Sequence, residues 1–154
     1  MKIFIFSFFL CFSFIEGQIG LEASTKASTA YEKARVSYHN LLLSKKRMQK
    51  RDQWISVIQK FDDIYKNFSS SREAYKSVFT NGNLYERLYV VSRRDKDLDQ
   101  AVGYYQKILQ EFKSDYLTDD ALFRQGEILF GRREYTAALK SFQRISKLTP
   151  QGDF

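Results

Sequence analysis

Apolar residues from Ser24 onward recur three and four positions apart, with polar residues between them. This is the period of an amphipathic helix, and it differs from the strict alternation of a half-buried strand. The pattern predicts helices over residues 29–43, 52–67, 70–91, 98–112, 118–131 and 134–147. Between them lie polar segments, of which the longest are SKKRMQKR (44–51) and SRRDKDLD (92–99). We therefore expect an all-α fold.

Several helix ends carry their own sequence signals. Ser70 with Glu73 three residues later matches a capping box, in which the two side chains satisfy backbone N–H groups at a helix start. Asp119 stands where the positive end of a helix dipole favours an acidic residue. Gly131 is suited to the left-handed turn after a helix, and Pro150 is a stop signal after the last one.

The first 23 residues follow a different pattern. Lys2 precedes a predominantly apolar run over residues 3–15, and a short polar stretch follows. This is the layout of a secretory signal peptide. The run is too short for a membrane-spanning helix, which takes about 20 apolar residues. The sequence thus predicts a signal peptide over 1–23, an exported domain over 24–154 and a periplasmic location, with an uncleaved signal anchor as the alternative.

The cysteine content and the net charge restrict the kinds of site and partner that we expect. The only cysteine, Cys11, lies in the apolar run and would leave with the signal peptide, so no disulfide or thiol site is expected in the exported chain. Cleavage after Gly17 or after Ala23 fits equally well. The formal net charge of +7 favours an anionic partner, without choosing between a membrane surface and a cell-wall polymer. Nucleic acid is not expected as a partner outside the cytoplasm.

An internal repeat organises the helices. FDDIYKNF, YQKILQEF and FQRISKLT begin at residues 61, 105 and 142, and each starts with an aromatic residue and has Ile at its fourth position. A repeat of this length indicates stacked supersecondary units in place of one closed bundle. We expect about three helical hairpins.

The last unit, residues 119–150, resembles the tetratricopeptide repeat. That family has a large apolar residue, a glycine, a second large residue, a small residue, an aromatic residue and a proline at set spacings, and the matching residues here are Leu122, Gly126, Leu129, Ala138, Phe142 and Pro150. The resemblance implies an α–α superhelix in which glycine and alanine let the helices of a hairpin approach closely. The intervals between the repeats exceed the family's roughly 34 residues.

The other two units fit the pattern less well. The middle unit places Gly82, Tyr85, Ala101 and Tyr105 at the same points, provided that its extra residues form a longer loop at 92–99. The first unit lacks the paired glycine and alanine. Its corresponding residues are Tyr38, Trp54, Val57 and Phe61.

Residues 91–130 and 51–68 also resemble the helical repeat region that precedes the catalytic domain in some Gram-negative N-acetylmuramoyl-L-alanine amidases. The resemblance implies a non-catalytic module of a cell-wall enzyme, with a zinc domain downstream of Phe154. TPQGDF (149–154) resembles a linker into a further hairpin, so we expect a chain truncated at its C-terminus. The alternative is a free-standing repeat protein of outer-membrane assembly or Tol-type envelope maintenance.

Catalysis by this chain itself is not expected. A catalytic zinc site takes three protein ligands, mostly histidine, and the chain has the single histidine His39. The neighbouring carboxylates in the pairs 62/63 and 119/120 point about 100° apart on a helix and do not face one another. The glycines are scattered and form no phosphate loop. We predict no catalytic residue, no metal, no cofactor and no small-molecule substrate.

Two sets of residues are candidates for binding. In the family, the first helix of each hairpin lines the concave surface, which gives a protein-binding groove of Phe79, Asn83, Glu86, Phe123, Glu127 and Phe130. Core packing is an equal alternative for the three phenylalanines. The cations Lys45, Lys46, Arg47, Lys50 and Arg51 could hold anionic groups, although a solvated helix end is the simpler interpretation.

Overall fold

The computed structural model describes residues 5–112 and 116–148, with side chains from Glu22 onward. Within these residues the chain forms seven helices and no strand, which confirms the all-α prediction. They are α1 (Ile5–Leu42), α2 (Lys45–Met48), α3 (Arg51–Asn67), α4 (Arg72–Ser92), α5 (Asp95–Glu111), α6 (Thr118–Gly131) and α7 (Tyr135–Leu148).

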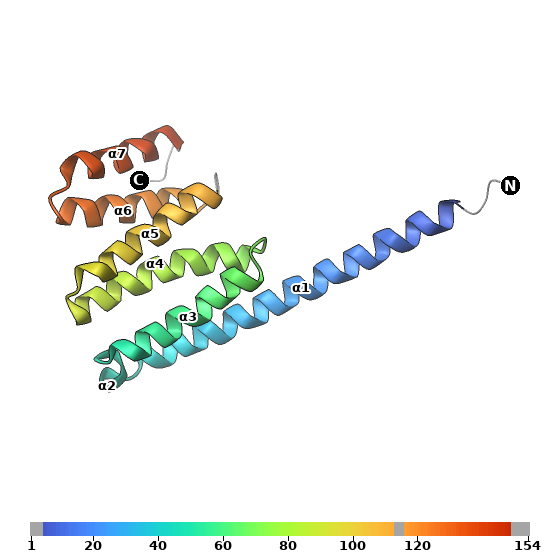
Figure 1. The fold of residues 1–154 in the computed structure, drawn as a ribbon, viewed down its shortest axis with the longest axis horizontal. Helices are drawn as coiled ribbons and strands as arrows, with labels where there is room; N and C mark the ends of the chain where they lie inside the picture. Colours follow the sequence, from blue (N-terminus) through green and yellow to red (C-terminus); the bar gives the residue numbers. More distant parts are fainter. Residues whose placement is uncertain (1–4, 113–115, 149–154) are drawn as a thin grey trace.

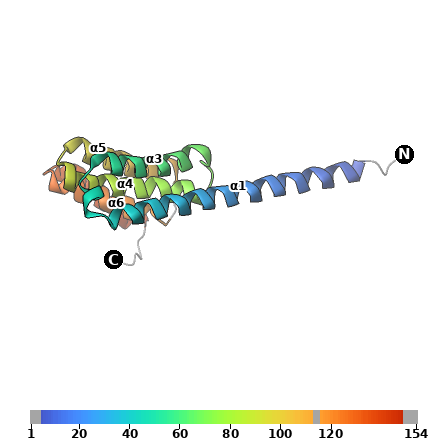
Figure 2. The same cartoon turned by 90° about the horizontal axis from the view of Figure 1, so that it is seen from below.

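The helices stack in chain order, as Figure 1 shows, with α1 at one end and α7 at the other. The pairs α1 with α3, α4 with α5 and α6 with α7 form three hairpins, and α4 and α6 also pack on the second helix of the preceding hairpin. Seen from below, α1, α4 and α6 lie on one side of the stack and α3 and α5 on the other (Figure 2). This is the predicted superhelix of about three hairpins.

A single helix, α1, runs from Ile5 through the first repeat, whereas the pattern predicted a helix starting at residue 29. Its N-terminal part projects away from the other helices (Figures 1 and 2). Among the described residues, no helix combines the length and apolar content that crossing a bilayer requires. Residues 1–4 of the predicted signal peptide, and the predicted stop at Pro150 and linker over 149–154, lie outside the described residues.

Two local predictions need correction. The cap of α4 is Ser71, whose side chain accepts a hydrogen bond from the Ala74 amide at 3.0 Å, so the capping box on Ser70 is wrong by one residue. The segment 44–51 is not all loop, because α2 forms within it. Ser44 caps this short helix by accepting from the Arg47 amide.

The extra residues of the middle unit extend its helices and not its loop. The helices α4 and α5 have 21 and 17 residues, against 14 each for α6 and α7. Only Arg93 and Arg94 separate α4 from α5, and Arg93 makes the turn in the left-handed conformation with a φ of 53°. The predicted loop over 92–99 is therefore wrong, since α5 already begins at Asp95.

Close packing inside each hairpin depends on a glycine. Gly82 of α4 lies against the ring of Tyr105, and Gly126 of α6 lies against the ring of Phe142. The small partners Ala101 and Ala138 are fully or almost fully buried. The predicted close approach at the two glycines is thus confirmed, and the group that meets each glycine is the ring that follows the alanine by four residues. Two core clusters result, one around Phe61 and one around Tyr105.

Candidate functional site

Two adjoining hollows form a groove on the side of the stack made by α1, α4 and α6. They have volumes of about 380 and 510 Å³ and share Thr80. The first lies mainly between α1 and α4, and the second extends to Arg124 of α6. We call this pair of hollows the groove. A separate hollow of about 630 Å³ lies beside the turn between α3 and α4 and is not part of it.

Three of the predicted groove residues line the groove: Phe79, Asn83 and Glu86. All three are half-buried and all three meet Tyr105. The Phe79 ring lies 5.7 Å from the Tyr105 ring, and the Tyr105 hydroxyl donates to the side-chain oxygen of Asn83 at 2.8 Å. The same hydroxyl also contacts the Glu86 carboxylate. These contacts hold the polar floor of the groove on the rigid body of the middle hairpin.

The three predicted residues on α6 do not line either hollow. Phe123 packs on Phe142 with ring centroids 6.1 Å apart, and Glu127 pairs with Arg124 at 3.1 Å. Phe130 is 60% exposed and contacts Tyr135. The structure therefore separates the predicted set into a groove part on α4 and a second part on α6.

Burial dominates the electrostatics of the floor. It raises the pKa of Glu86, and the hydrogen bond from Tyr105 partly offsets that rise. The pKa of Tyr105 is raised as well, first by burial and then by the Glu86 charge. The Glu86 carboxylate on the floor is thus a hydrogen-bond acceptor that is held in place and only partly solvated.

Cations surround this floor, and sequence reasoning did not find them. The Arg87 guanidinium lies over the Tyr38 ring at 6.0 Å, and the Lys76 ammonium lies over the Tyr31 ring at 5.7 Å. Such contacts hold long cationic side chains beside aromatic faces. In the structure the Tyr31 ring meets the Phe61 ring as Phe79 meets Tyr105. Ala34, three residues after Tyr31 and 1% exposed, therefore takes the place of Gly82, and Tyr38 takes that of Glu86 in the lining of the groove.

The predicted anion patch divides into four exposed cations and one internal group. Lys45, Lys46, Arg47 and Lys50 are exposed on and just after α2. Arg51 is instead tied to the body of the protein. Its guanidinium pairs at 2.5 Å with the carboxylate of Asp97, which is only 1% exposed.

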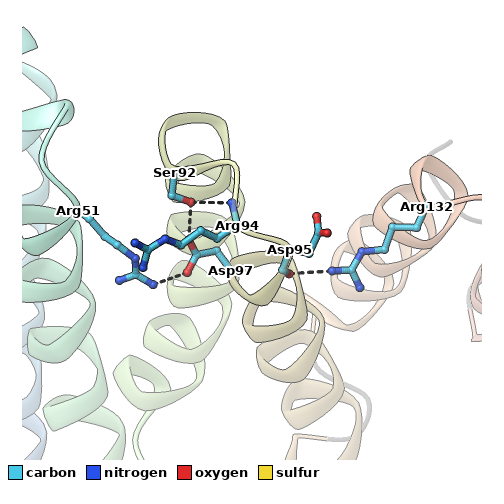
Figure 3. Close-up of polar contacts among 6 residues, drawn as sticks. All are labelled: Arg51, Ser92, Arg94, Asp95, Asp97 and Arg132. Carbon is cyan, nitrogen blue, oxygen red and sulfur yellow. Dashed lines mark hydrogen bonds and ion pairs between the residues drawn. The ribbon is translucent and has the colours of Figure 1, made fainter.

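This ion pair belongs to a set of contacts around the turn between α4 and α5 (Figure 3). Asp97 also accepts from the Ser92 hydroxyl at 2.5 Å. On the other side of the turn, Arg132 donates to the Asp95 carbonyl at 2.9 Å. The turn of the middle hairpin is thereby linked to the hairpins before and after it, so we assign Arg51 a structural role.

Ligands for a metal do not gather anywhere in residues 22–112 and 116–148: no group of three His, Cys, Asp or Glu side chains lies together there. His39 is exposed on α1. The groove itself presents hydrogen-bonding groups, charges and aromatic faces.

Stacked helical hairpins that present one row of helices to a groove define the class of helical-repeat proteins. Within this class, residues 120–151 match the family model described as tetratricopeptide repeat, so the chain carries a repeat of that family. Such repeats are protein-interaction modules. No curated protein and no solved structure matches the chain, and the resemblance to the amidase repeat region stays a prediction.

Proposed function

We propose that this chain is a periplasmic interaction module that binds a segment of a partner protein in the groove. The observation that carries the proposal is the continuity of the groove across α1, α4 and α6, with a polar floor held in place by Tyr105. The tetratricopeptide match over residues 120–151 supports a protein ligand, because repeats of that family are protein-interaction modules.

The charges of the groove suggest what the partner carries. Four cations line the two hollows, Arg35, Lys76, Arg87 and Arg124, against the two carboxylates Glu32 and Glu86. Complementary charge steers encounter and fixes register across an interface. A partner segment with acidic side chains fits this lining.

The proposed setting is the cell wall. Residues 91–130, which include most of α5 and α6, carry the resemblance to the amidase repeat region, and the proposed role is to position such an enzyme. Under this proposal the zinc chemistry belongs to a downstream catalytic domain, and this chain supplies only binding.

Capture from an envelope extract tests the groove directly. Arg87→Glu reverses an exposed charge in the groove, and Lys96→Glu makes the same change on an exposed residue of α5. We expect the wild type and Lys96→Glu to retain the same partner protein and Arg87→Glu to lose it. Purified wall fragments added as competitor show whether the partner is wall-associated. Equal retention by all three proteins would refute the groove proposal.

A second proposal concerns the four exposed cations on and just after α2. Such a cluster can hold anionic lipid or wall polymer. Changing Lys45, Lys46, Arg47 and Lys50 to Gln should abolish sedimentation of the chain with wall sacculi or anionic vesicles at low salt. Arg51 is left intact because its change would disturb the fold. Unchanged sedimentation would dispose of this proposal.

A further inference from the structure

The last hairpin leaves large apolar side chains uncovered at the end of the stack. Phe130, Tyr135 and Leu139 are 60%, 56% and 55% exposed. The rings of Phe130 and Tyr135 lie 5.4 Å apart, and Tyr135 and Leu139 are neighbours on one face of α7 because they stand four residues apart. We call these three residues the end face.

Repeat register shows what normally covers such a face. The aromatic residues Phe61, Tyr105 and Phe142 occupy one place in the three hairpins, and Leu139 stands three residues before the last of them. The residues that stand three positions before Phe61 and Tyr105, and so correspond to Leu139, are Ile58 in α3 and Val102 in α5. Ile58 is only 2% exposed.

The cover in the earlier units is a helix. Ile58 and Trp54, which is 3% exposed, pack in one cluster with Leu84 and Leu88 of α4. In the next unit, Val102 packs in a cluster that contains Leu122 of α6. The first helix of the following hairpin thus packs on α3 and on α5, within the clusters to which Ile58 and Val102 belong. At α7 the same surface is formed, and no helix of the described residues covers it.

Charge selects among the helices that could bind there. Residues 133–148 contain the four cations Arg133, Lys140, Arg144 and Lys147 against the single carboxylate Glu134. Lys140, Arg144 and Lys147 are all exposed. A second copy packed on this face through its own α7 would bring these cations together, and that repulsion disfavours a self-complementary dimer.

We propose that the end face binds an acidic amphipathic helix of a partner protein, seated on α7 as α6 is seated on α5. Its apolar stripe covers Tyr135 and Leu139, and its acidic residues face Lys140 and Lys147. This inference does not depend on the groove, because the residues that line the groove lie on α1, α4 and α6 and beside them, whereas Tyr135 and Leu139 lie on α7.

A peptide with the sequence of α6 is the probe, because α6 packs on α5 in the structure. The segment 118–131 forms α6 and carries Asp119, Asp120 and Glu127 against one cation, Arg124. The fluorescein-labelled peptide is titrated with the full chain at low salt, and anisotropy is measured. A second peptide has the three acidic residues replaced by Lys.

We expect the acidic peptide to bind, and the charge-reversed peptide to bind at least tenfold more weakly. Leu139→Ser should weaken the acidic peptide at least tenfold, because burying a leucine side chain contributes about 1.5–3 kcal/mol and each 1.4 kcal/mol is about a factor of ten. The matched control is Leu43→Ser, which changes a leucine that is 71% exposed and lies far from α7 in the chain. It should leave binding unchanged, as should Arg87→Glu in the groove.

Any of five results would overturn the proposal. The first is no binding of the acidic peptide, the second is equal binding of the two peptides, and the third is equal binding of the acidic peptide by the wild type and Leu139→Ser. The fourth is a wild-type dimer in sedimentation experiments that Leu139→Ser converts to monomer, since the face would then be an interface between copies. The fifth is loss of peptide binding in Arg87→Glu, which would place the peptide in the groove.

Discussion

Two glycines decide how closely the helices of each later hairpin approach. A Cβ atom at Gly82 would lie 2.5 Å from Cε1 of Tyr105, and one at Gly126 would lie 2.7 Å from Cζ of Phe142. Both distances are far below an ordinary carbon–carbon contact of about 3.5–4.0 Å. The rings are buried or half-buried in the hairpin and have little room to retreat.

Gly126→Ala should therefore lower the free energy of unfolding by about 1–3 kcal/mol, the usual cost of overpacking. Gly103 is the matched control, because it also lies inside a helix but a Cβ there meets nothing within 4 Å. Gly103→Ala should raise the free energy of unfolding by about 0.5–1 kcal/mol. Urea unfolding of both variants checks this, and an equal gain in both would contradict the glycine–ring contact.

Arg51 supports a second residue-scale prediction. Its removal leaves the buried Asp97 carboxylate without its cation, so Arg51→Gln should lower the free energy of unfolding by about 3 kcal/mol. The exposed neighbour Lys50 is the control, and Lys50→Gln should change stability by less than about 0.5 kcal/mol. Thermal and urea unfolding measure both changes. Similar small effects of the two changes would contradict the structural role of Arg51.

Alkaline pH gives a third residue-scale prediction. The Tyr65 hydroxyl donates to the Glu111 carboxylate at 2.6 Å, and this bond raises the pKa of Tyr65 to about 12. The unfolded chain releases this proton near pH 10, before the folded one does. The contribution to stability is thus complete below pH 10 and is lost as pH rises toward 12. Unfolding measured from pH 9 to 12 should show a smaller loss in Tyr65→Phe, and an identical loss would contradict the bond.

At the scale of residues, the sequence predicted the glycine and alanine positions but not the buried ion pair. The glycine and alanine places were readable because only small residues fit them and their spacing recurs. The Arg51–Asp97 pair was not readable, since its members are separated by 46 positions and Arg51 looks like one more cation of a basic run. A long-range ion pair leaves no periodic signal in one sequence.

Helix length is what distinguishes the three hairpins at the scale of elements. The polarity of the segment 92–99 predicts a loop. In the structure, however, Ser92 ends α4 and residues 95–99 belong to α5. Asp95 and Asp97 in the first turn of α5 stabilise the positive end of its dipole. Arg93 makes the turn in a conformation that non-glycine residues seldom adopt. The polarity of the segment therefore does not distinguish loop from helix, whereas the acidic residues of the first turn favour a helix.

The cap of α4 gives a prediction for an element. Ser71→Ala should lower the free energy of unfolding by about 1 kcal/mol, the usual contribution of a serine N-cap. Ser70→Ala, one residue earlier and exposed, should change it by less than about 0.5 kcal/mol. Urea unfolding of the two variants measures both effects. The reverse order would restore the capping box that the sequence pattern predicted.

The whole molecule is a stack with two different binding surfaces. The groove lies along α1, α4 and α6, and the last helix, α7, carries the end face. Figure 1 shows α7 at one end of the stack. Phe79, Asn83 and Glu86, which repeat register predicted as groove residues, line the groove, and their binding of a partner stays a prediction. Repeat register could not predict that α6 contributes Arg124 in place of Phe123 and Glu127, because that depends on how the hairpins turn relative to one another.

Photo-crosslinking tests the central claim, that the chain binds a protein partner through the groove, most directly. The crosslinking residue p-benzoylphenylalanine replaces Val90, which is 62% exposed and lines the groove, or Gln106, which is exposed on α5. After irradiation in an envelope extract, the account predicts a discrete crosslinked protein from position 90 and none from position 106. The same product from both positions, or from position 106 alone, would contradict it.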